Sequence, residues 1–153
     1  MNLSKKSAIR FYFVLSLVFI SKRLAMDYKE FYTELGKLLY AVAKADGEVQ
    51  DEELHKIYQM VVNDLSDEML FERGDEVDAY YTEFEFEALI DRNTEMDVAM
   101  NSFIDFYNKN KGEFTDKMIE TTLKAMIAVA DAYDGIVPEE QELIDELKEK
   151  LGR

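Results

Sequence analysis

Two Asp-Gly turns carry the side chains of this chain that are best suited to chemistry. Asp46-Gly47 is followed by Glu53, seven residues after the aspartate. The second pair, Asp134-Gly135, is followed by Glu140 and Glu142. Carboxylate oxygens are the ligands that hard cations prefer, and the chain has no Cys and only 1 His. We therefore expect any metal held by these five acids to be Ca²⁺, Mg²⁺ or Mn²⁺.

The first turn matches only the second half of a calcium-binding EF-hand loop. Gly47 is followed by an apolar residue and then by the acid Glu53, as in that loop. The two earliest ligand positions would be Val42 and Lys44, which cannot coordinate calcium. In the second copy the acidic position falls on Gln141. Neither turn is therefore an EF-hand.

The same turns also have a purely structural interpretation. Glycine readily takes the left-handed conformation that ends a helix, and acids after the turn complement the dipole of the next helix. The two Asp-Gly pairs lie 88 residues apart, which is too long for a solenoid repeat and indicates one internal duplication. A cation site and a structural role remain alternatives at this point.

Apolar residues recur at helical spacing from Asp27 to the end of the chain. The spacing predicts an all-α fold, a single compact bundle of six or seven helices with two Asp-Gly helix-turn-helix motifs. The predicted segments are 27–45, 51–63, 66–74, a helix from 75 that includes the strand-like stretch 83–87, a helix from 94 to a loop at 108–112, 115–134 and 138–151. The predicted apolar faces include Phe31, Leu35, Leu38, Leu39 and Val42 in the first segment, Leu54, Ile57, Tyr58, Val61 and Val62 in the second, and Val77, Tyr80, Tyr81, Phe84 and Ala88 in the helix from 75.

Charge divides the chain into two parts, residues 1–25 and an acidic domain at 26–153. The whole chain has 18 Lys and Arg against 33 Asp and Glu. No acid precedes Asp27, so residues 26–153 carry 13 bases against 33 acids, a net charge of −20. Such a domain repels phosphate backbones, which argues against nucleic acid as a partner and favours cations or basic protein surfaces. Five basic residues lie in the first part: Lys5, Lys6, Arg10, Lys22 and Arg23.

Residues 1–25 admit three interpretations. Basic residues flank the apolar run 11–20, as in a secretory signal, but the residues after the run make a poor cleavage site. The run is too short to cross a hydrocarbon core of about 30 Å. The segment could therefore be a removed signal, an uncleaved anchor or interfacial helix, or a misassigned start upstream of Met26. Asp27 as N-cap with Glu30 closing a capping box favours the last alternative.

The sequence offers no recognisable catalytic constellation. No glycine-framed Ser accompanies His55, no Gly-rich phosphate loop is present, and the absence of Cys excludes thiol chemistry. We therefore predict that the protein is not an enzyme, and we expect a cytoplasmic location, with membrane association through residues 1–25 as an alternative.

The run Ala41–Val49, with Glu53 after it and Asp134-Gly135 near the C-terminus, resembles the TerB-like family, which is named for bacterial tellurite-resistance proteins. The resemblance covers about residues 27–151. It implies an all-helical fold that brings two such motifs together, acidic clusters that bind metal ions, and a role in bacterial stress response linked to membrane-associated complexes. Gln141 departs from the second motif, where Glu140 or Glu142 could substitute after a shift of one residue.

Two hypotheses for function follow. In the first, the chain is a stress-response module in which carboxylates at the Asp-Gly turns hold a divalent cation. In the second, it is an acidic protein-interaction domain that recruits basic partners and needs no metal.

Overall fold

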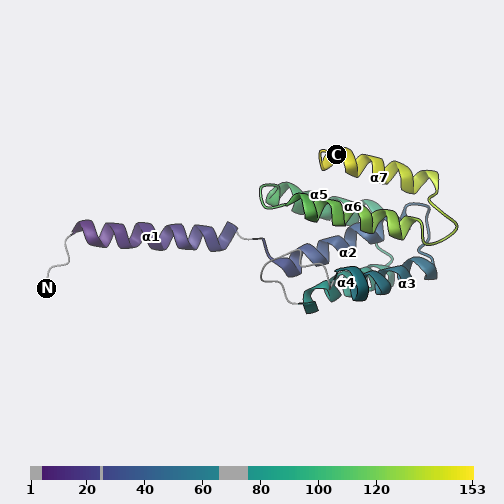
Figure 1. The fold of residues 1–153 in the computed structure, drawn as a ribbon, viewed down its shortest axis with the longest axis horizontal. Coiled ribbons are helices and arrows are strands. Elements are labelled where there is room, and N and C mark those ends of the chain that lie inside the picture. The colour runs from purple at the N-terminus through teal and green to yellow at the C-terminus, as the bar shows by residue number, and fades with distance from the viewer. Residues whose placement is uncertain (1–4, 25, 66–75) are drawn as a thin grey trace.

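The computed structural model describes residues 5–24, 26–65 and 76–153, and this part of the chain is helical with no strand (Figure 1). The prediction of an all-α fold is therefore confirmed. The elements, in chain order, are α1 Lys5–Leu24, α2 Tyr28–Lys44, α3 Asp51–Met60, the π-helical turn η1 Val61–Leu65, the 3-10 turn η2 Glu76–Ala79, α4 Tyr80–Asp91, α5 Met96–Asn110, α6 Asp116–Ala130 and α7 Pro138–Lys150.

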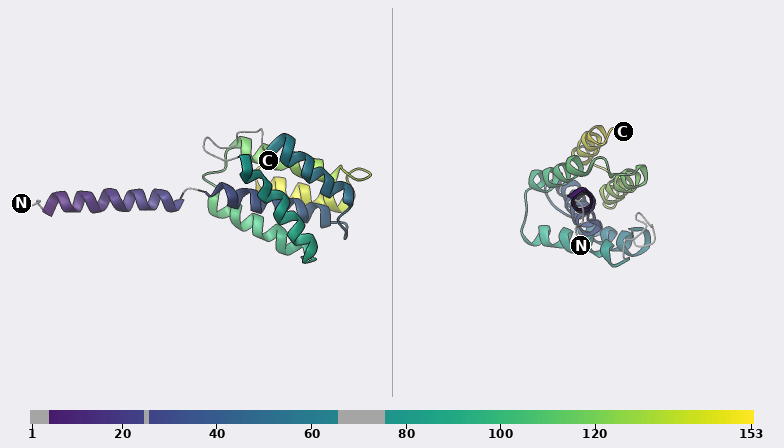
Figure 2. Two further views of the ribbon diagram at one scale, coloured as in Figure 1. Left: turned by 90° about the horizontal axis from the view of Figure 1, so that it is seen from below. Right: turned by 90° about the vertical axis from the view of Figure 1, so that its left-hand side faces the viewer.

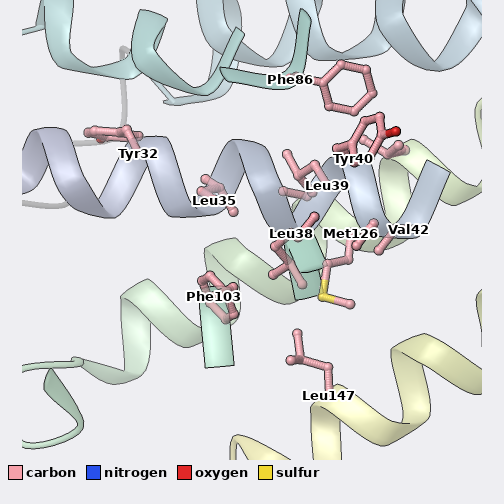
Figure 3. Close-up of a cluster of buried hydrophobic side chains, with 14 of the residues drawn as sticks. Tyr32, Leu35, Leu38, Leu39, Tyr40, Val42, Phe86, Phe103, Met126 and Leu147 are labelled. Atoms are coloured by element: carbon pink, nitrogen blue, oxygen red, sulfur yellow. The ribbon is translucent and has the colours of Figure 1, made fainter. Parts of the chain in front are cut away.

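Helix α2 is the centre of the bundle and contacts α4, α5, α6 and α7. Its predicted apolar face is confirmed, because the five residues of that face are fully buried: Phe31, Leu35, Leu38, Leu39 and Val42. Figure 3 shows side chains of other helices on both sides of α2, with Phe86 near Tyr40 and with Phe103, Met126 and Leu147 beyond Leu38. A helix enclosed on several sides fixes the positions of the elements around it.

A glycine lets α2 and α4 approach each other closely. A Cβ atom at Gly36 would lie 2.5 Å from the backbone oxygen of Thr82, a distance that no real contact tolerates. On the same side of α2, the hydroxyl of Thr82 donates a hydrogen bond of 3.0 Å to the backbone oxygen of Tyr32. The packing of these two helices therefore needs a residue without a side chain at position 36.

Several predicted helix ends are confirmed. Asp27 accepts a hydrogen bond from the backbone N–H of Lys29, Thr115 accepts one from that of Met118, and Pro138 occupies the first turn of α7. Two predictions were wrong. The helix predicted from 94 begins at Met96, after the N-cap Glu95, and α5 runs to Asn110, into the predicted loop 108–112.

The end of α6 was also placed too late. The helix stops at Ala130, before the Asp-Gly pair that was expected to end it. Residues 131–135 form the turn instead. The periodic apolar residues end at Val129 and Ala130, which are both buried, so the core contacts that hold the helix end there too.

The buried face of α4 differs from the predicted one. Tyr80, Tyr81 and Phe84 are exposed, whereas Phe86 is fully buried, and Thr82 and Leu89 are buried with it. Apolar side chains occur on every side of this helix, so periodicity alone did not select the face that contacts α2. In the segment 51–63, the prediction that Val62 belongs to the buried face was likewise wrong, because this residue is exposed on the π-helical turn η1. The predicted helix 66–74 and the side chain of Val77 lie outside the described residues.

Helix α1 projects away from the bundle, as the two further views in Figure 2 show. Within the described residues no other element makes an extensive contact with it. Among the same residues, no helix is both long enough and apolar enough to cross a membrane.

Candidate functional site

Both Asp-Gly turns lie at the same end of the bundle, where α2 leads into α3 and α6 leads into α7 (Figure 1). The backbone angle φ is +113° at Gly47 and +84° at Gly135. Only glycine adopts these values without strain, so each glycine lets the chain reverse and start a new helix. The two turns thus bring the first residues of α3 and α7 to one end of the molecule.

Each new helix begins with a glutamate that turns back to cap it. Glu53 is the third residue of α3, and its Oε2 accepts a hydrogen bond of 2.7 Å from the backbone N–H of Gln50. Glu140 is the third residue of α7, and its Oε2 accepts one of 3.0 Å from the backbone N–H of Val137. These bonds satisfy backbone donors that a helix start leaves free. They also turn both carboxyl groups toward the protein interior.

The two glutamates meet in the interior. Glu53 is 2% exposed and Glu140 is 3% exposed. A hydrogen bond between the two carboxyl groups raises the pKa of Glu53 and lowers that of Glu140, which makes Glu53 the donor when it is protonated. Two acids in contact away from water do not both ionise, because neither solvent nor a counter-charge screens their repulsion. One shared proton therefore joins the two Asp-Gly repeats.

The pKa values of both acids reflect this environment. Burial, followed by the charges of Glu140 and Asp46, raises the pKa of Glu53 from its ordinary value of 4.5 to about 7, although the hydrogen bond from Gln50 opposes the shift. Burial and the charge of Asp46 also raise the pKa of Glu140. Near neutral pH the pair is thus poised to lose its proton.

The position of Glu140 explains the apparent break in the second motif. Helix α3 begins four residues after Gly47, whereas α7 begins three residues after Gly135. The second turn is one residue shorter, so the third residue of its helix is Glu140 and not Gln141. The two copies are therefore equivalent when they are aligned on their helix starts.

The structure brings together two of the five acids that the sequence selected. Glu53 and Glu140 are in contact, and the charge of Asp46 acts on both of them. Asp46 itself is exposed, and its Oδ1 accepts a hydrogen bond of 3.3 Å from the backbone N–H of Glu48. Asp134 and Glu142 are exposed as well. Among the residues that the structure describes, no three acidic or histidine side chains are grouped closely enough to hold a metal ion as they stand.

A groove that the sequence did not reveal lies beside this end of the bundle. It has a volume of about 660 Å³ and runs between α3 and the end of α6. Acidic residues dominate its charge, because Asp51, Glu52 and Asp131 face it together with one lysine, Lys56. The remaining lining residues are His55, Gln59, Ala128 and Ala132. The sequence places Asp51, Glu52 and Asp131 among the carboxylates around the two Asp-Gly turns, but it does not show that the packing of α3 on α6 gathers them in one groove.

The model of the family described as tellurite resistance protein TerB matches residues 33–152. The chain belongs to the TerB family. The match includes both Asp-Gly turns and the Glu53–Glu140 pair, and it confirms the resemblance that the sequence motifs indicated. Comparison with curated proteins and with solved structures finds no match for this TerB chain.

Proposed function

We propose that this TerB chain is a non-catalytic helical module of bacterial stress response that binds a divalent cation through Glu53 and Glu140. The observation that carries the proposal is the contact between these two buried carboxyl groups, which come from the two Asp-Gly repeats. Acids are rarely buried together unless a proton or a cation relieves their repulsion. The role in stress response follows from the description of the family, tellurite resistance.

The donor set suits a small, hard cation. Mg²⁺ is commonly held by one or two carboxylates and keeps several water ligands, whereas Ca²⁺ takes six to eight oxygens. Glu53 and Glu140 would supply the two carboxylates, and Asp46 is the nearby acid that could act directly or through water. We therefore favour Mg²⁺ or Mn²⁺ over Ca²⁺ as the ion.

Such an ion would connect the start of α3 to the start of α7. Ligand carboxylates bind metal only when they are deprotonated, so binding would release the shared proton and would strengthen as the pH rises. The contact between the start of α3 and the start of α7 would then be more rigid. A partner protein that binds the acidic end of the bundle would respond to this change.

Thermal unfolding of the full chain tests this proposal. Wild type would be treated with a chelator and then with MgCl₂, MnCl₂ or CaCl₂, alongside Glu53→Gln, Glu140→Gln and Glu142→Gln. A ligand at a hundred times its dissociation constant stabilises the folded state by about 2.7 kcal/mol, which is a rise of several degrees. We expect this rise in wild type and in Glu142→Gln, whose altered side chain is exposed on the same helix, and we expect its loss in the other two variants.

The opposite result is also informative. If Mg²⁺ and Mn²⁺ leave the unfolding temperature unchanged, or raise it equally in all four proteins, Glu53 and Glu140 do not hold a cation. Their shared proton would then have a structural role only.

A second candidate function rests on the acidic groove between α3 and α6. Its lining favours a lysine- or arginine-rich segment of a partner protein, because three acids face it beside one lysine. We expect a basic peptide to bind the wild-type chain in the presence of a chelator and to bind Asp51→Asn/Asp131→Asn less tightly. Asp105→Asn is the matched control, since this acid is exposed on α5, away from the groove. Equal binding to all three proteins would exclude the groove as the docking site.

A further inference from the structure

We propose that α1 inserts just below the headgroups of an anionic lipid bilayer and tethers the acidic bundle to it. The first observation is the isolation of α1, which projects from the bundle in both Figure 1 and Figure 2. Its apolar side chains from Ile9 to Leu17 are exposed, and Phe13 alone is 65% exposed. Exposed apolar surface of this extent marks a region that another phase or partner covers.

The distribution of apolar residues around α1 favours lipid over a protein partner. A helix that docks in a protein groove has one apolar face, but Ile9, Phe11, Tyr12, Phe13, Val14 and Leu15 are consecutive or nearly so and surround the helix. A helix that is apolar on all sides is stable only where apolar material surrounds it. Acyl chains below the headgroups provide that surrounding, whereas the surface of a second copy would cover one side.

Length and charge place the helix at the membrane surface. The apolar run 11–20 is about 15 Å long at 1.5 Å per residue, or half of a hydrocarbon core of about 30 Å. Lys5, Lys6 and Arg10 are exposed at the first end of α1, and Lys22 and Arg23 fall in its last turn. Basic residues attract anionic headgroups, and long basic side chains at both ends of the helix can reach those headgroups while the apolar run lies among the acyl chains just below them.

The acidic bundle gives the tether an orientation. Residues 26–153 carry a net charge of −20, so an anionic surface repels them. Only the first part of the chain is complementary to such a surface. The bundle would thus be held at the membrane by α1 and kept off the headgroups by its own charge, which leaves the Glu53–Glu140 end and the groove open to solution.

A tryptophan reporter tests this tether, because the chain contains no Trp. Full-length Phe13→Trp would be mixed with vesicles of phosphatidylcholine and phosphatidylglycerol, and with vesicles of phosphatidylcholine alone. We expect a blue shift of the fluorescence with the anionic vesicles only. Phe84→Trp is the control, since Phe84 is exposed on α4 of the bundle and its reporter should keep its wavelength.

Charge variants of the Phe13→Trp protein separate the contribution of the basic residues to membrane binding from that of the apolar run. Lys5→Gln/Lys6→Gln should lose most of the shift, and added salt should have the same effect. Lys117→Gln/Lys124→Gln, which removes as much charge from exposed positions on α6, should retain it. A missing shift, or an equal shift with phosphatidylcholine alone, would overturn the proposal. A shift that depends on protein concentration without vesicles would assign the apolar run to a second copy of the chain.

Discussion

The carboxyl group of Glu53, when it is protonated, donates a hydrogen bond to the carboxylate of Glu140. Each of these two residues also caps the helix on which it lies. The pair therefore stabilises the start of α3, the start of α7 and the contact between these two helices. Loss of the proton leaves two negative charges in contact in the interior, with the charge of Asp46 close by. This relationship makes the stability of the bundle sensitive to pH.

We predict that the free energy of unfolding falls as the pH rises from about 4.5 to about 7 in the presence of a chelator. Glu53 keeps its proton up to about pH 7 in the folded chain, whereas its ordinary pKa is 4.5. The folded state thus binds more protons than the unfolded state in this window, and raising the pH favours unfolding. The difference between the two pKa values corresponds to on the order of 3 kcal/mol.

Urea unfolding at a series of pH values measures this effect, and Glu53→Gln isolates it. The amide of the glutamine can donate to Glu140 and accept from Gln50, as the protonated acid does, but it does not titrate. We expect the variant to be more stable than wild type above pH 7 and to lack the fall. Glu142→Gln should behave as wild type, because Glu142 is exposed. The same pH dependence in Glu53→Gln and wild type would show that the pair does not share a proton.

The sequence predicted the helical fold because most helices have a single apolar stripe. On α2 the residues Phe31, Leu35 and Leu38 leave no choice of face, and all three are buried. On α4 the choice depends on tertiary contacts, since Phe84 and Phe86 are equally apolar and only the latter contacts Tyr40. Local patterns therefore identify a helix but not always its buried face.

Local patterns also predicted part of the candidate site. An acid at the third position of a helix is a known cap, so the positions of Glu53 and Glu140 follow from the starts of α3 and α7. Their contact does not, because it depends on how two helices far apart in the sequence pack together. The shorter second turn also moved the alignment from Gln141 to Glu140, which spacing from Asp134 could not show.

The close contact between α2 and α4 leads to a second prediction. Gly36→Ala should destabilise the bundle, because its new methyl group would lie 2.5 Å from the backbone oxygen of Thr82 and the helices would have to move apart. Overpacking of this kind costs about 1–3 kcal/mol, and a clash with backbone belongs to the upper part of that range, above the gain in helix propensity of about 1 kcal/mol. Chemical denaturation measures the net loss. Gly112→Ala is the control, since no atom lies within 4 Å of a Cβ at that position. Equal stability of the two variants would contradict the proposed contact.

A third prediction concerns the buried polar link between α2 and α5. Glu34 is 7% exposed; its Oε1 accepts a hydrogen bond of 2.6 Å from Lys37 Nζ, and its Oε2 accepts one of 2.9 Å from Ser102 Oγ. Ser102→Ala removes the hydroxyl through which α5 donates to this carboxylate, and it also leaves Lys37 without its contact of 3.1 Å to that hydroxyl.

The expected cost of Ser102→Ala is about 1–3 kcal/mol, because hydrogen bonds to charged groups contribute more than neutral ones and a buried carboxylate is left with fewer partners. Urea unfolding at neutral pH measures it. Asn101→Ala is the matched control, since Asn101 is the exposed neighbour on the same helix. The double variant Glu34→Gln/Ser102→Ala then distinguishes a charged link from simple packing: its cost should be smaller than the sum of the two single costs, because each change removes the same interaction. Additive costs would show that Glu34 and Ser102 stabilise the fold independently, and that the link between α2 and α5 rests on their apolar neighbours.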